Sequence, residues 1–302
     1  MPTSALIQQL LDAGVHFGHQ TKRWNPKMKP FIFGSRSGIY IIDLEQTEQH
    51  LVRAGEAIEQ FAAKGDLVLF VGTKKQAKRI VQEAAVRCGM PFVTGRWLGG
   101  TLTNFPVMKR NIDRLLLLRR QRVEGYFERL SKKDGIRLLR ELEQLEESYA
   151  GVSTLDRLPA CVYIVDPKRE QNAAREANRL HIPIVAICDT NADPDLITHP
   201  VPGNDDAIRS LKLIVGLLAD ACLEGRREFL TAASVTPLTQ PSSAPDAEEP
   251  AEAVAVPADP LQEVEAIAPA SVVPIIEGAP VKGTRPRKTV KKAAPAGEAS
   301  GG

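Results

Sequence analysis

Three short runs of continuous apolar residues constrain the fold of this chain more than any other feature. They are LVLFV at 67–71, CVYIVD at 161–166 and PIVAICD at 183–189. A strand that is apolar at every position is buried on both faces, as in a parallel sheet. Helical patterns alternate with these runs, over 75–87, 168–180 and 205–224. The sequence therefore predicts an α/β fold in which helices cover both faces of a parallel sheet.

The amino-terminal region adds smaller elements to this sheet. We expect a helix over 4–13, capped by Ser4, and a second helix that starts after Thr47 and runs to about Ala63. Between them, 14–30 has no clear periodicity. The segment FIFGSRSGIYIIDL (31–44) predicts two short strands around a Gly/Ser turn.

Residues 107–150 have a different character. Two stretches, 107–123 and 132–150, are rich in leucine and charge, with leucines at three- and four-residue spacing. Gly125 separates them, and Ser131 with Asp134 has the spacing of a capping box. We predict an antiparallel helical hairpin, a coiled coil, inserted into an α/β domain made of 1–106 and 151–230.

The remaining segment, 231–302, is rich in Pro, Ala, Ser and Glu and has no sustained apolar periodicity. This composition predicts a disordered tail. Its 9 acidic residues outnumber its 6 basic ones, but all six basic residues fall in 282–292. A nucleic-acid-binding arm and an ordinary charged tail both fit this pattern.

The charge of the chain is distributed unevenly. The formal net charge is only +2, yet residues 72–122 contain 12 basic and 2 acidic residues. Such an excess attracts polyanions, because each neutralised phosphate releases bound counterions. The four cysteines form no CxxC pair, which favours reduced, buried thiols. We expect no secretory signal, no membrane-spanning segment and no membrane partner.

The enzyme hypothesis finds little support in the motifs. The loop after 67–71 reads GTKKQ and lacks the spacing of a G-x-x-x-x-G-K-[ST] phosphate loop. Neither G-x-G-x-x-G nor G-x-S-x-G occurs in the sequence. We therefore predict no catalytic residues, no cofactor and no small-molecule substrate. An α/β nucleotide-binding protein or enzyme of unknown substrate is the alternative hypothesis.

Two groups of residues raise the question of a metal. His16 and His19 are three residues apart but lack a third ligand nearby, so structural or RNA-contacting roles are favoured. Five aspartates would suit Mg²⁺, but Asx turns and helix capping, with Asn204 as a cap, explain them as well. They are Asp189, Asp193, Asp195, Asp205 and Asp206. The sequence assigns no metal site.

Two segments combine cations with tryptophan and polar residues, TKRWNPKMKP (21–30) and GRWLGGTLTNF (95–105). Cations bind phosphates, Thr and Asn donate to backbone oxygens, and an aromatic ring stacks on an exposed base. Core packing is the alternative role for either tryptophan. The predicted RNA-binding residues are Lys22, Arg23, Trp24, Asn25, Lys27, Lys29, Arg36, Lys74, Lys75, Arg96, Trp97, Thr101, Thr103, Asn104, Lys109 and Arg110.

Several long segments together resemble one known family. They are AGVHFGHQTKRWNPKMKPFIFGSRSGIYIIDLEQT, FVGTKKQAKRIV, GRWLGGTLTNF, VDPKRE and IPIVAICDTNADPDLITHPVPGNDDAIRSLKLI. In collinear order over about 4–227, they resemble the bacterial and organellar members of the second small-subunit ribosomal protein family. Ordered agreement over several motifs is far more specific than a single pattern.

The resemblance implies a structural role in translation. It implies an α/β domain with a projecting coiled-coil hairpin, bound to small-subunit rRNA and assembled late, near the head–body junction. Other small-subunit proteins, including the large mRNA-binding protein one, are the implied partners. We expect a cytoplasmic ribosome as the location, with an organellar ribosome as the alternative. The resemblance implies nothing about the tail.

Overall fold

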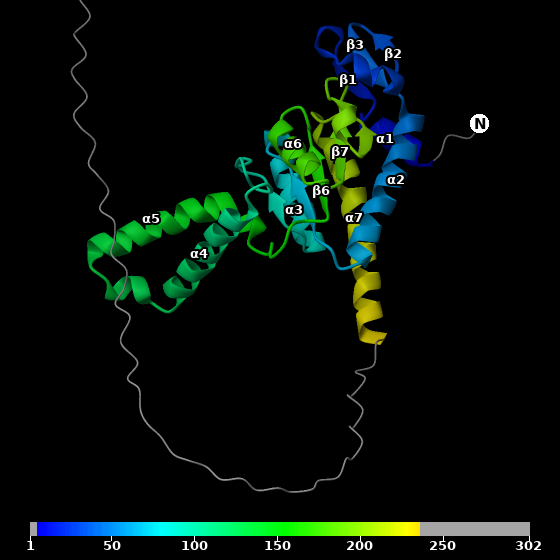
Figure 1. Ribbon diagram of the computed structural model, residues 1–302. Coiled ribbons are helices and arrows are strands. Elements are labelled where there is room, and N and C mark those ends of the chain that lie inside the picture. The colour runs from blue at the N-terminus through cyan, green and yellow to red at the C-terminus, as the bar shows by residue number, and fades with distance from the viewer. Residues whose placement is uncertain (1–4, 236–302) are drawn as a thin grey trace, which may run out of the picture. The chain divides into compact units, whose positions relative to one another are not determined.

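The computed structural model describes residues 5–235, with side chains to residue 232 (Figure 1). The predicted cap at Ser4 and the part of the predicted tail over 236–302 lie outside the described residues. Five parallel strands form the main sheet, in the order β5-β4-β6-β7-β8. Their bounds are β4 Val68–Val71, β5 Phe92–Val93, β6 Cys161–Val165, β7 Ile184–Cys188 and β8 His199–Pro202. The predicted parallel sheet is thus confirmed.

The alternation of side chains divides the core into two layers. Phe70 and Tyr163 point to one face of the sheet, whereas the neighbouring Leu69 and Val162 point to the other. The first face packs against α2 (Leu44–Ala63), α3 (Lys75–Cys88) and α7 (Ile208–Val235). The second packs against α6 (Gln171–Arg179), the segment around Trp97 and the start of α4 (Phe105–Val123). Because both faces are covered, β4, β6 and β7 are apolar at every position.

A second, smaller sheet precedes the main one in the chain. Its three antiparallel strands lie in the order β1-β3-β2, with bounds Phe17–Gln20 for β1, Ile32–Arg36 for β2 and Ile39–Ile42 for β3. The strands predicted in 31–44 are confirmed. β1 lies in the segment that the sequence analysis left irregular, because FGHQ has little strand propensity and pairs with β3 through tertiary contact. Helix α1 (Ala5–Asp12) precedes this sheet.

Helices α4 and α5 (Lys132–Tyr149) lie side by side and lead away from the sheet as a pair (Figure 1). Leu115, Leu118 and Leu142 are buried between them with Phe127. The capping box is confirmed, because the Ser131 hydroxyl donates to Asp134 and accepts from its backbone N–H. Ion pairs from Arg114 to Glu141 and from Arg119 to Glu146 join the two helices. Part of the positive charge of α4 is therefore neutralised by glutamates of α5.

The observed starts of α2, α6 and α7 differ from the predicted ones, and local capping explains two of these differences. α2 begins at Leu44 rather than after Thr47, because the Asp43 side chain accepts from the backbone N–H of Glu45. α7 begins at Ile208 rather than Asp205, after an Asn204 side chain that accepts from Asp206 and Ala207. α6 begins at Gln171 rather than at residue 168. β8 was not predicted, since its sequence HPVP contains two prolines.

The end of α7 corrects the predicted start of the tail. This helix runs to Val235, past the predicted end at Glu224 and past residue 231. Gly225 allows α7 to approach α2 closely, because a Cβ atom there would collide with the carbonyl oxygen of Glu59. Arg226 donates from Nη1 to the carbonyl oxygen of Cys88 at 2.7 Å. Tertiary contacts of this kind extend a helix in ways that periodicity does not reveal.

Five short 3₁₀ helices complete the secondary structure of the described residues. They are η1 Thr21–Arg23, η2 Pro26–Phe31, η3 Tyr126–Arg129, η4 Ala150–Val152 and η5 Pro194–Leu196. Among the described residues, no helix is both long enough and apolar enough to cross a bilayer.

Candidate nucleic-acid interface

Polar loops gather at the carboxyl edge of the main sheet. In parallel strands the carboxyl ends meet at one edge, where α/β proteins usually bind their ligands. Thr73 and Lys74 follow β4, Asp166 follows β6, Asp189 follows β7 and Asp205 follows β8. The loop 21–30, which joins β1 to β2 of the small sheet, is bonded to the same edge, since the backbone N–H of Asn25 donates to the carbonyl oxygen of Thr190 at 2.8 Å.

Loop 21–30 presents its cations outward. Lys22, Arg23 and Lys29 are exposed, and no ion pair joins them to any other described residue. Trp24 is half-buried and packs on Tyr40, with 5.1 Å between the ring centroids. The Asn25 side chain caps η2 by accepting from the backbone N–H of Lys27. The loop therefore combines a hydrogen-bonded backbone with exposed, unpaired positive charge among the described residues.

Lys27 differs from the other lysines of this loop. Its Nζ lies 2.9 Å from Asp193 and 2.7 Å from Asp195. Hydrogen bonds to Asp195 and Asp193 raise the pKa of Lys27 above its ordinary value. Asp193 also accepts from the backbone N–H of Asp195, as the predicted Asx turn requires. The positive charge of Lys27 is thus balanced within the protein.

A cleft of about 370 Å³ lies beside Trp24. Its lining includes Trp24, Pro26, Lys168, Arg175 and Asn191. The sequence analysis did not select Lys168 and Arg175, although VDPKRE carried part of the family resemblance. Both are exposed cations, and only the fold brings them next to the tryptophan. Strand β6 and helix α6, which flank Lys168, were the signals that could have pointed to this edge.

The second tryptophan segment, 95–105, is organised around one carboxylate that the sequence analysis also missed. Glu176, on α6, accepts from the indole N–H of Trp97 at 3.1 Å and from the backbone N–H groups of Gly100 and Leu102 at 2.9 and 3.0 Å. It also accepts from the backbone and the hydroxyl of Thr103. Burial opposes ionisation of Glu176, but these donors outweigh it and hold its pKa below the ordinary value.

These bonds turn much of the segment inward. Trp97 is only 7% exposed and belongs to the core on the second face of the sheet. Thr101 is buried as well, with its hydroxyl donating to the carbonyl oxygen of Leu98. Thr103, Asn104 and Arg96 are exposed. In this conformation Trp97 has the packing role that the sequence left open.

The remaining predicted cations fall into two groups, those without an ion pair and those paired with a carboxylate. Arg36, Lys75 and Arg110 are exposed and form no ion pair with the described residues. Lys109 lies 2.7 Å from Asp156. Lys74 is half-buried, with its Nζ 2.8 Å from Asp205, 2.6 Å from Asp206 and 3.7 Å from Asp166. Burial opposes its protonation, but the bond to Asp205 and the other carboxylates raise the pKa of Lys74.

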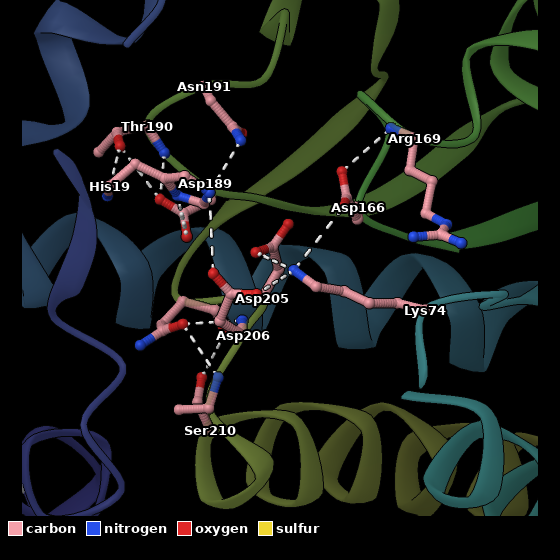
Figure 2. Close-up of polar contacts among 12 residues, drawn as sticks. His19, Lys74, Asp166, Arg169, Asp189, Thr190, Asn191, Asp205, Asp206 and Ser210 are labelled. Carbon is pink, nitrogen blue, oxygen red and sulfur yellow. Dashed lines mark hydrogen bonds and ion pairs between the residues drawn. The ribbon is translucent and has the colours of Figure 1, made fainter. Parts of the chain in front are cut away.

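The acidic group around Lys74 contains a histidine (Figure 2). His19 Nδ1 lies 3.0 Å from Asp189, and Nε2 lies 3.8 Å from Asp206. The hydrogen bond to Asp189 raises the pKa of His19. Burial, followed by the nearby charges of Asp189 and Asp166, raises the pKa of Asp205 to about 7. His16 lies apart from this group, with its ring on Phe17, so the two histidines do not share a ligand.

Comparison with known proteins accounts for most of the chain. A family model described as ribosomal protein S2 matches residues 10–225. A protein named small ribosomal subunit protein uS2 from Dictyoglomus turgidum is 57% identical over 221 residues, 73% of this chain and 90% of its own length. Proteins of that name from Sorangium cellulosum and Syntrophobacter fumaroxidans are 55% and 53% identical, over 72% and 74% of this chain and 79% and 81% of their own lengths. The chain therefore belongs to the ribosomal protein S2 family.

Proposed function

We propose that this chain is a structural component of the small ribosomal subunit that binds small-subunit rRNA and helps to dock neighbouring proteins during translation. Membership of the ribosomal protein S2 family supports the ribosomal role, and ribosomal proteins of this family are structural rather than enzymatic. The observation that carries the RNA-binding part is that Lys22, Arg23 and Lys29, around Trp24, are exposed and have no acidic partner among the described residues, unlike Lys27.

We assign the phosphate contacts to exposed cations that are free to exchange their counterions. A cation that is already paired with a protein carboxylate contributes less binding free energy when it contacts a phosphate. The proposed contacts are Lys22, Arg23, Lys29, Arg36, Lys75, Arg96, Arg110, Lys168 and Arg175. Lys27, Lys74 and Lys109 would have to leave their carboxylates first.

The other predicted contacts take different roles in this proposal. Trp24 offers part of its ring to a base at the mouth of the cleft, where base–aromatic stacking contributes about 1–3 kcal/mol. Asn25, Thr103 and Asn104 are polar groups available to the sugar–phosphate backbone. Trp97 and Thr101 would act indirectly, by fixing the backbone on which Arg96 and Thr103 are displayed.

We further propose that α4 and α5 form a coiled-coil insertion over 107–150, between the two parts of an rRNA-binding domain, 1–106 and 151–230. Leucines buried between the helices and the ion pairs across them support this division. The protein partners would be other small-subunit proteins, including the large mRNA-binding protein one. Phe33 on β2 is 81% exposed, which suits a protein contact at the small sheet.

The proposed location is the ribosome of the cytoplasm, with an organellar ribosome as the alternative. A nucleotide-binding protein or enzyme is not favoured, since the chain belongs to a ribosomal family and its loop after β4 reads GTKKQ rather than a phosphate loop.

The RNA-binding proposal is tested by a double charge reversal, Lys22→Glu with Arg23→Glu. Binding of the full chain to small-subunit rRNA is measured over a series of salt concentrations. We expect weaker binding and a slope of log affinity against log salt that is smaller by about two. Lys132→Glu with Lys133→Glu, a pair of adjacent exposed lysines in the first turn of α5, is the matched control. Equal losses in both double variants would contradict the assignment of the loop.

A further inference from the structure

The cleft beside Trp24 has a volume that suits one nucleotide. It measures about 370 Å³, near the lower end of the range for pockets that bind small ligands. A base pair inside a helix cannot enter such a space, whereas an unpaired nucleotide can turn its base into it. Proteins that recognise RNA by sequence commonly bind unpaired bases of loops and bulges in this way. The volume therefore favours a single nucleotide over a duplex.

The lining of the cleft is partly apolar, as a nucleobase requires. Trp24, Pro26, Pro167 and Leu196 contribute rings and an aliphatic side chain to it. Trp24 also packs on Tyr40, which limits the movement of its ring. An aromatic side chain stacks on any base, because every base has a π face. This part of the lining is therefore suited to hold a base by stacking.

The backbone around the cleft is held in place before a ligand binds. The backbone N–H of Asn25 donates to the carbonyl oxygen of Thr190 at 2.8 Å, which ties loop 21–30 to the end of β7. The Asn178 side chain donates to the carbonyl oxygen of Leu196 at 2.8 Å, which ties η5 to α6. A site that is formed in advance loses less conformational entropy on binding.

A buried oxygen atom of a residue in the lining has no partner. Asn191 lines the cleft, and its Oδ1 is buried and accepts no hydrogen bond among the described residues. Its Nδ2 lies 3.0 Å from His19 Nε2 (Figure 2). Because the Asp189 carboxylate accepts from His19 Nδ1, Nε2 of the neutral ring accepts from the Asn191 amide. The amide is thus oriented with its oxygen left for a donor outside the protein.

Every nucleobase carries the donor that this oxygen lacks. Amino or ring N–H groups lie on the Watson–Crick edge of all four bases. In a base pair these groups are already bonded to the partner base, whereas in an unpaired nucleotide they are available to a protein acceptor. Buried acceptors are normally satisfied, so Asn191 points to such a ligand. The missing donor and the volume of the cleft favour the same class of ligand.

The charges around the cleft suit the phosphate of that nucleotide. Lys168 and Arg175 line the cleft, are exposed and form no ion pair with the described residues. Asp193, a carboxylate in the lining, is paired with Lys27 at 2.9 Å, so its negative charge is already neutralised. A phosphate at the rim would therefore meet two available cations.

We propose that this cleft binds one unpaired nucleotide of the small-subunit rRNA. Trp24 stacks on its base, and the Asn191 oxygen accepts from its Watson–Crick edge. Lys168 and Arg175 contact its phosphate. This inference rests on the proposed function and adds to the phosphate contacts a pocket that fixes the position of the chain along the RNA. The sequence analysis did not select Asn191, because only the fold brings it beside the tryptophan loop.

Tryptophan fluorescence makes the occupancy of the cleft observable. The chain contains two tryptophans, so Trp97→Phe leaves Trp24 as the only one. We expect the fluorescence of Trp24 to be quenched as small-subunit rRNA is added to the full chain, because a stacked base quenches an indole. Trp24→Phe is the control and should show little quenching, since Trp97 is buried in the core. Thermal unfolding of each variant without RNA checks that it is folded.

Substitutions in the cleft should weaken the binding of small-subunit rRNA, measured by filter retention. Asn191→Ala removes the acceptor and should lower the affinity about fivefold. Lys168→Gln with Arg175→Gln should lower the slope of log affinity against log salt by about two. Lys132→Gln with Lys133→Gln, a pair of exposed lysines on α5, is the matched control and should bind as the parent chain does.

Two further ligands distinguish an unpaired rRNA nucleotide from other sources of the same chemistry. A fully paired RNA duplex should leave the fluorescence of Trp24 unchanged. Free AMP, GMP, CMP and UMP should quench it only at concentrations well above those of the rRNA. Equal quenching by the duplex, or quenching by a free nucleotide at the concentrations at which rRNA acts, would overturn the assignment.

The outcomes separate this inference from the proposed function. If the parent chain binds small-subunit rRNA while Trp24 fluorescence does not change, or if Asn191→Ala binds as tightly as the parent chain, the nucleotide cleft is wrong and the RNA-binding function stands. If the folded parent chain does not bind small-subunit rRNA, both are wrong.

Discussion

Two segments of this protein look alike in sequence and differ in structure. Loop 21–30 and segment 95–105 both place an arginine directly before a tryptophan, among polar and glycine or proline residues. In the first, Trp24 is half-buried beside an open cleft and the cations point outward. In the second, Trp97 is 7% exposed and the backbone turns inward. The first segment exposes most of its charged side chains. The second buries Trp97 and Thr101 and exposes only a few polar side chains.

The difference comes from carboxylates that lie elsewhere in the chain. Glu176 accepts hydrogen bonds from the indole N–H of Trp97 and from three backbone N–H groups of segment 95–105. Among the described residues, no carboxylate accepts a hydrogen bond from Trp24. Of the cations in loop 21–30, Asp193 and Asp195 bind only Lys27. A cation–aromatic pattern therefore predicts an RNA-binding surface only where the fold leaves it without internal acceptors.

Replacing each tryptophan by alanine should give the largest contrast. Trp97→Ala should lower the free energy of unfolding by about 3–5 kcal/mol, because it empties part of the core. Trp24→Ala should lower it by only about 1 kcal/mol, since the ring is partly exposed. Urea unfolding measures both values. Under conditions in which both variants are folded, Trp24→Ala should lower the affinity for RNA more than Trp97→Ala does. A larger loss of RNA affinity in Trp97→Ala would contradict the contrast.

Glu176→Gln should have the next largest effect. The neutral side chain accepts fewer of the donors in segment 95–105, at a cost of about 1–2 kcal/mol near neutral pH. The folded pKa of Glu176 is depressed, so its contribution is complete above the ordinary value of 4.5 and is lost as the pH falls through the folded pKa.

The stability difference between the parent chain and Glu176→Gln should therefore be constant at neutral pH and shrink in acid. Urea unfolding between neutral pH and the acid limit measures it. Glu141→Gln, which removes the Arg114 pair on the two long helices, provides a comparison outside the segment. A difference that grew as the pH fell would show that Glu176 does not act as the ionised acceptor.

Freeing Lys27 should have the smallest effect. Asp193→Asn with Asp195→Asn removes the two carboxylates that neutralise it and leaves a fourth available cation in loop 21–30. The salt dependence of RNA binding should steepen by about one phosphate contact. The same change made together with Lys27→Ala should abolish that gain. A gain that persisted without Lys27 would mean that the lost negative charge acts on RNA at long range.

The sequence predicted the parallel sheet because its strands are buried on both faces and therefore read as continuous apolar runs. It predicted the capping box at Ser131 because capping is local. It missed β1 and β8, which are short and lack strand-forming residues, since their pairing is decided by tertiary contact. Glu176 and Arg175 were missed for a similar reason, since helical periodicity places them on α6 without showing which loop they face.

Sedimentation of the tagged full chain from a cell lysate, with and without ribonuclease, tests the central claim most directly. The account predicts stoichiometric migration with small ribosomal subunits at moderate salt, and loss of that migration after ribonuclease treatment. A chain that stayed in the light fractions while the rRNA was intact would contradict it.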